Sequence, residues 1–182
     1  MARPVASLLL CQPLTGDQLK GLEGWLNRVG RITMVENSPD NRYSADFVFT
    51  NFPPLVTDST NPSCTFLLDL IDPETNAEFR FEGGEKESLQ EKLGFVPKEL
   101  MLVSAICNQP LDHQLLAHIL IELAGKFGAN QVNLQGKIDN RPDLPGKVIE
   151  VPSEEHPGFV PIIVDVEFLK NWLNHPRFYM IK

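Results

Sequence analysis

The chain has 182 residues, 42% apolar side chains and a net charge of −8, values that suit a soluble globular protein. The negative charge disfavours a protein that grips a phosphate backbone, because such a protein needs a basic face. The apolar run near the N-terminus, residues 5–10, is too short for a signal-peptide core or a membrane span. We therefore expect a cytoplasmic protein with no nucleic-acid or membrane partner.

The three cysteines are widely spaced and form no CxxC motif. This spacing argues against a disulfide framework and against a zinc site, so we expect neither a metal nor a cofactor. Cys11 and Cys107 each end an apolar run, which predicts that they are small buried hydrophobic residues.

The first half of the chain predicts two helices. Thr15 and Gln18 form a capping-box pattern ahead of a helix that stops at Gly30, and a short helix over residues 85–93 ends at Gly94. Turn formers crowd residues 37–41, and a hairpin turn at residues 73–76 joins the last two of the predicted strands. Those strands are residues 5–10, 31–36, 43–50, 64–70 and 77–81.

The second half restarts with the strand over residues 100–107. A helix then opens at Pro110 and is capped by Gly128, and a second helix is capped by Asp165 and halted at His175 and Pro176. The further predicted strands are residues 131–134, 147–151, 161–164 (as an edge strand) and 177–182.

Both halves therefore follow the same order of strands and helices. The order predicts an α+β fold, a mostly antiparallel sheet with helices packed on one face, possibly built from two βαββα-like halves, residues 1–98 and 99–182. One continuous sheet in a single domain is the first choice, and two small packed lobes are the alternative.

Negative charge is concentrated in one segment. Residues 69–91 hold eight acidic and two basic side chains, a net charge of −6. Such a segment is either a solvated edge hairpin whose charge blocks aggregation or a docking surface for a basic partner. The predicted partner-binding residues are Asp69, Asp72, Glu74, Glu78, Glu82, Glu85 and Glu87. On the predicted strand, Glu78, Arg80 and Glu82 share one face, and Phe79 and Phe81 face the core.

Signatures of catalysis are absent from the sequence. No phosphate loop, dinucleotide fingerprint or nucleophile elbow occurs, and His118 with Glu122 reads as a solvated pair opposite the apolar stripe of its helix. The alternative enzyme site is the strand-to-helix junction that holds Cys107, Asp112 and His113, since such junctions often carry α/β active sites. It would make the protein a small cytosolic hydrolase or transferase.

Two segments, residues 103–113 and 164–182, resemble an uncharacterised family of small bacterial proteins associated with polymorphic-toxin immunity genes. The family offers no catalytic residues to carry over. The resemblance implies an immunity protein, which binds and neutralises a cognate toxin without catalysis, and the acidic segment then implies a basic toxin. An adaptor or structural subunit is the remaining alternative.

Overall fold

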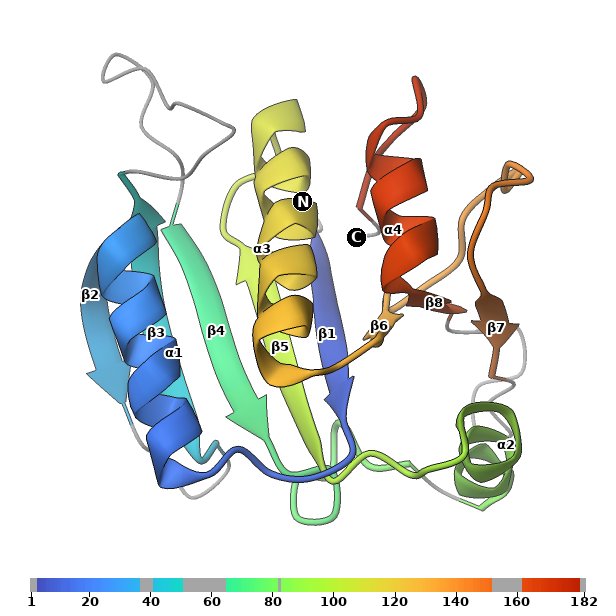
Figure 1. Ribbon diagram of the computed structural model, residues 1–182, viewed down its shortest axis with the longest axis horizontal. Helices are drawn as coiled ribbons and strands as arrows, with labels where there is room; N and C mark the ends of the chain where they lie inside the picture. Colours follow the sequence, from blue (N-terminus) through green and yellow to red (C-terminus); the bar gives the residue numbers. More distant parts are fainter. Residues whose placement is uncertain (1–2, 37–40, 51–64, 82, 152–161, 181–182) are drawn as a thin grey trace.

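The computed structural model describes residues 3–36, 41–50, 65–81, 83–151 and 162–180. Its eight strands form one sheet in the order β2-β3-β4-β5-β1-β6-β8-β7, and every neighbouring pair is antiparallel (Figure 1). The strands are β1 (Val5–Leu10), β2 (Gly30–Glu36), β3 (Tyr43–Phe49), β4 (Thr65–Ile71), β5 (Glu99–Ala105), β6 (Gln131–Asn133), β7 (Val148–Glu150) and β8 (Ile162–Asp165). The predicted α+β class with an antiparallel sheet is confirmed.

Three helices cover one face of this sheet, as Figure 1 shows: α1 (Gly16–Val29), α3 (Pro110–Phe127) and α4 (Val166–Leu173). Between them and the sheet lies the main core, to which the alternate strand residues Leu8 and Leu10 of β1 belong. The remaining helix, α2 (Gly84–Leu93), packs on the opposite face, because its Leu89 shares a second apolar cluster with Leu9. The sheet is therefore covered fully on one face and partly on the other.

The helix ends form where the sequence places them. The Thr15 hydroxyl accepts from the Gln18 amide, and the Gln18 side chain accepts from the Thr15 amide, so the capping box is confirmed. Asp165 accepts from the amide of Phe168 at the start of α4. Gly94 and Gly128 end α2 and α3 with φ angles of 84° and 68°, in the left-handed region that favours glycine.

The two halves of the chain interleave in the sheet. Each half begins with a strand, β1 or β5, and these two strands pair with each other at its centre. Strands β5 and β6 run parallel with β1 between them, so β5, α3 and β6 form a split βαβ unit. The main core contains side chains of both halves, such as Leu22 and Phe168.

Several sequence predictions are wrong. Residues 77–81 form turns and irregular chain instead of a strand, and residues 177–180 form no strand either. The strand predicted at the edge, residues 161–164, is β8, which lies between β6 and β7. Cys11 and Cys107 are exposed instead of buried. Cys64, most of the turn predicted at residues 37–41 and the loop predicted at residues 154–158 lie outside the described residues.

One buried carboxylate links the start of β5 to the segments that precede α1 and β3. Glu99, at the start of β5, is 2% exposed; it accepts a 2.8 Å hydrogen bond from the amide of Leu14 and pairs with Arg42 at 2.6 Å. Burial raises the pKa of Glu99, while the Leu14 amide and the Arg42 charge oppose that rise. No periodicity in the sequence marks this contact, because its partners lie far apart along the chain.

Candidate partner-binding surface

The face of the sheet opposite α1, α3 and α4 carries polar side chains in register. Glu36 of β2 pairs with Ser44 of β3, Ser44 with Asp69 of β4, and Asp69 with Leu102 of β5. Cross-strand partners point to the same side of a sheet, so these residues form one row on the face that α2 only partly covers. The adjacent row holds Met34, Asp46 and Leu67, which also pair with one another.

Three carboxylates of these rows interact through their charges. The Asp69 carboxylate accepts hydrogen bonds from the Ser44 hydroxyl at 2.6 Å and from the Asn41 amide at 3.3 Å. Burial raises the pKa of Asp46, and the negative charges of Asp69 and Glu36 raise it further. None of the three carboxylates forms a salt bridge within the described part of the chain. This face therefore holds like charges that a cation could relieve.

A second group of carboxylates follows β4 in the chain. Asp72 accepts from the amide of Glu74 at 2.8 Å, which closes a local turn, and Glu74 pairs with Lys86 of α2 at 3.2 Å. Glu78 is exposed in the next turn. Glu85 and Glu87 occupy the first turn of α2, where the helix dipole favours negative charge.

The predicted acidic hairpin does not form, because no strand follows the turn at residues 73–76. Glu78 and Arg80 therefore do not share a strand face, and the Arg80 guanidinium donates to the carbonyl of Glu74 instead. Phe79 and Phe81 do face a core, since both pack against the apolar cluster beneath α2. Glu82 lies outside the described residues.

Two sets of acidic residues thus follow one another along the chain at β4, which carries Asp69 and is followed by Asp72. We name them together the acidic surface: Glu36, Asp46 and Asp69 on the sheet face, and Asp72, Glu74, Glu78, Glu85 and Glu87 on the turns and α2. Sequence reasoning found all of these except Glu36 and Asp46. Alternation along residues 43–49 could have placed Asp46 on the outer face, but only the register of three strands brings it close to Asp69.

Comparison with known proteins gives one match. The profile of a family of unknown function, DUF6368, matches residues 2–182. The chain belongs to the DUF6368 family. No curated protein and no solved structure matches it.

The junction proposed as an enzyme site in this DUF6368 protein is held by structural hydrogen bonds. The carboxylate of Asp112 accepts from the amide of Gln109 at 2.8 Å and caps α3. His113 is 6% exposed; its Nε2 bonds Asn108 Oδ1 at 2.8 Å, and its Nδ1 accepts from the amide of Met180 at 2.8 Å. Both ring nitrogens are therefore used in structural hydrogen bonds, Nδ1 to the C-terminal segment and Nε2 to Asn108 just ahead of α3.

The remaining described histidines of the DUF6368 chain lie near α4. His118 is half-buried on α3, and burial lowers its pKa against the opposing charge of Glu122. Glu122 is exposed and also accepts from the indole of Trp25 at 2.9 Å, so of the predicted solvated pair only the carboxylate lies in solvent, while the imidazole is half-buried. His175 follows α4, stacks on Trp172 and donates its amide to the Trp172 carbonyl, as expected of a residue that ends a helix.

The described residues of the DUF6368 chain contain neither a cluster of metal-ligating side chains nor a membrane-spanning helix. No group of three His, Cys, Asp or Glu side chains there is arranged to hold a metal ion. Among the described helices, none has the length and apolar character needed to cross a membrane.

Proposed function

We propose that this protein binds and neutralises a basic partner protein, a bacterial toxin, through the acidic surface and without catalysis. The observation that carries the proposal is the set of carboxylates on the sheet face. The charges of Glu36 and Asp69 each repel that of Asp46, and none of the three carboxylates has a salt bridge among the described residues. Lysine and arginine side chains of a partner would replace that repulsion with attraction.

The electrostatics favour fast encounter with such a partner. A surface of one charge sign raises association rates by roughly 10- to 1000-fold at low salt, and the effect declines with ionic strength. Toxins that cut nucleic acid carry basic residues for phosphate, so an inhibitor that presents carboxylates can cover the same residues. The half-buried apolar side chains Leu67 and Leu102 lie among the carboxylates and offer area for burial.

The inhibitor role is suggested by the resemblance of residues 103–113 and 164–182 to an uncharacterised bacterial family associated with polymorphic-toxin immunity genes. Such an inhibitor would act in the cytoplasm, where a toxin would meet its target. The described residues among them form the end of β5, the start of α3, the end of β8, α4 and residues 174–180, none of which carries a residue of the acidic surface. The resemblance therefore supports the inhibitor role but gives no support to the acidic surface as the binding site, which needs its own test.

The test uses the toxin domains encoded next to the gene, since inhibitors are usually encoded beside their targets. Association with the purified protein is measured by surface plasmon resonance at 50 and 500 mM NaCl. The double variant Glu36→Lys, Asp46→Lys changes the charge of the sheet face by +4 and should slow association at least 10-fold at low salt. Glu78→Lys tests the turns in the same way.

The control matched to Glu78→Lys is Asp143→Lys, which makes the same charge change of +2 at an exposed loop position outside the acidic surface. It should leave the association rate within about 2-fold. An association rate that is unchanged in the double variant, or that falls equally in the control, would rule out the acidic surface as the docking site.

A further inference from the structure

A groove runs between α3 and α4 on the helical side of the sheet, away from the acidic surface. Its volume is about 500 Å³, within the range of small-molecule sites. The described residues that line it are Gln114, His118 and Ile121 of α3 and Lys170, Leu173 and Asn174 of α4. The two helices pack against each other side by side, so the walls rest on the main core (Figure 1).

The groove combines positive charge with an apolar wall. Lys170 is exposed and forms no salt bridge with a described residue, which leaves its ammonium group available to an anion. Ile121 and Leu173 are half-buried and present apolar surface beside it.

The neighbouring polar groups fit this reading. The carboxylate nearest to His118 along α3 is Glu122, which is held toward α1 by the indole of Trp25 at 2.9 Å. Asn174 donates one of its side-chain N–H groups to the carbonyl of Lys170, and Gln114 is an exposed amide donor of the groove. His118, whose pKa is lowered by burial, adds a neutral imidazole at neutral pH.

We propose that this groove binds a small carboxylate with an unbranched apolar tail. Lys170 pairs with the carboxylate, Gln114 donates a hydrogen bond to it, and the tail lies along Ile121 and Leu173. The site is independent of the docking role, since none of its residues belongs to the acidic surface.

In the test, the full chain is titrated with butyrate, hexanoate or hexylamine. Two-dimensional amide NMR spectra monitor binding at each step. Hexanoate, with only eight non-hydrogen atoms, should have a dissociation constant on the order of 10 mM. Hexanoate should therefore produce saturable shifts at residues 114, 118, 170 and 174 in that range. It should bind about 3- to 10-fold more tightly than butyrate, because two more methylenes contact the apolar wall. Hexylamine, of opposite charge, should not bind.

Two variants decide the role of the lysine. Lys170→Gln should weaken the binding of hexanoate at least 3-fold. It should leave the melting temperature unchanged, because the Lys170 side chain forms no salt bridge with a described residue. Lys20→Gln, the same substitution at an exposed position on α1, should change nothing. Equal affinity for butyrate and hexanoate, hexylamine binding as well as hexanoate, or an unchanged affinity in Lys170→Gln would each overturn the proposal.

Discussion

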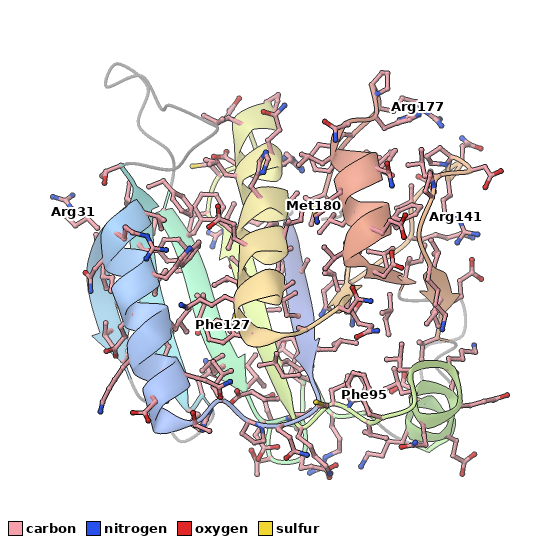
Figure 2. All side chains as sticks on the ribbon, in the orientation of Figure 1. Arg31, Phe95, Phe127, Arg141, Arg177 and Met180 are labelled. Carbon is pink, nitrogen blue, oxygen red and sulfur yellow. The ribbon has the colours of Figure 1, made fainter. Side chains whose placement is uncertain are left out.

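The Nδ1 atom of His113 accepts a 2.8 Å hydrogen bond from the backbone amide of Met180, 67 residues further along the chain. Met180 lies between α3 and α4 in Figure 2 and is 1% exposed. The bond therefore fastens the C-terminal segment to the first turn of α3. Because Nδ1 accepts, Nε2 carries the proton and donates to Asn108 Oδ1.

Replacing His113 tests this fastening. His113→Phe keeps an aromatic ring but leaves the buried amide of Met180 without an acceptor, at a cost of about 2 to 3 kcal/mol in the free energy of unfolding. Urea unfolding measures the change. Asn108→Ala, which removes only the partner of Nε2, should cost about 1 kcal/mol. A His113→Phe protein as stable as the parent would show that the hydrogen bond contributes nothing.

Tyr43 presents the reverse case, a polar group whose removal should stabilise the protein. Its hydroxyl is buried and has no hydrogen-bond partner in the described structure. Tyr43→Phe removes that desolvated group and should raise the free energy of unfolding by about 1 kcal/mol. In contrast, Tyr179→Phe removes an acceptor for the amide of Asp139 and should give no gain. A loss of stability in Tyr43→Phe would mean that the hydroxyl has a partner in solution.

The pH dependence of Tyr43 has a definite sign. Burial raises its pKa from 10.0 to about 12, with a further contribution from the charge of Glu23. The folded state holds the proton more tightly than the unfolded state, so this residue lowers stability as pH rises from 10 towards 12. The free energy of unfolding of Tyr43→Phe should therefore fall less between pH 10 and 12 than that of the parent protein.

Most elements could be predicted from the sequence because their signals are local. The capping box of Thr15 and Gln18 and the glycines after α2 and α3 each determine an end within a few residues. The failures involve long-range contacts. Phe79 and Phe81 alternate with charged residues as in a strand. In the structure they pack beneath α2, and residues 77–81 form turns and irregular chain.

The acidic surface was also predictable only where its signal is local in the sequence. The charge of residues 69–91 is visible in the sequence, but Glu36 and Asp46 join it only through the strand register. β2 even shifts its register between Ile32 and Met34, which alters the faces that simple alternation assigns. The junction of Cys107 and His113 could not be interpreted either, because Met180, the partner of the imidazole, lies at the other end of the second half.

Two glycines should respond in opposite ways to replacement by alanine. A Cβ atom at Gly146 would lie 2.2 Å from the Phe168 amide nitrogen, and the φ angle there is 110°. Gly146→Ala should therefore cost about 3 kcal/mol or more, through both the steric overlap and the unfavourable backbone angle. Gly24, inside α1, has open space at its Cβ position, so Gly24→Ala should stabilise by about 0.5 to 1 kcal/mol. Thermal unfolding of the two variants measures both changes in stability. Equal effects would show that the loop at Gly146 rearranges to accommodate the added Cβ atom.

The repulsion on the sheet face can be measured without any partner. The pKa of Asp46 is raised above its usual 3.8 by burial and by the charges of Asp69 and Glu36, so its ionised form is less favourable in the folded state than in the unfolded state. This residue therefore lowers stability as pH rises through the acid range, and the loss persists at pH 7. Asp46→Asn should raise the free energy of unfolding at pH 7 by up to about 0.5 kcal/mol.

The gain in Asp46→Asn should vanish near pH 3, where the parent residue is protonated in both states, and it should shrink in 0.5 M salt, which screens exposed charges. Asp143→Asn, the same substitution at an exposed loop position outside the acidic surface, should give no gain at pH 7. Urea unfolding at pH 3, 5 and 7 measures both proteins. A pH-independent change in Asp46→Asn would indicate altered packing instead of charge, and the acidic surface would then lack the unrelieved repulsion that a basic partner is proposed to neutralise.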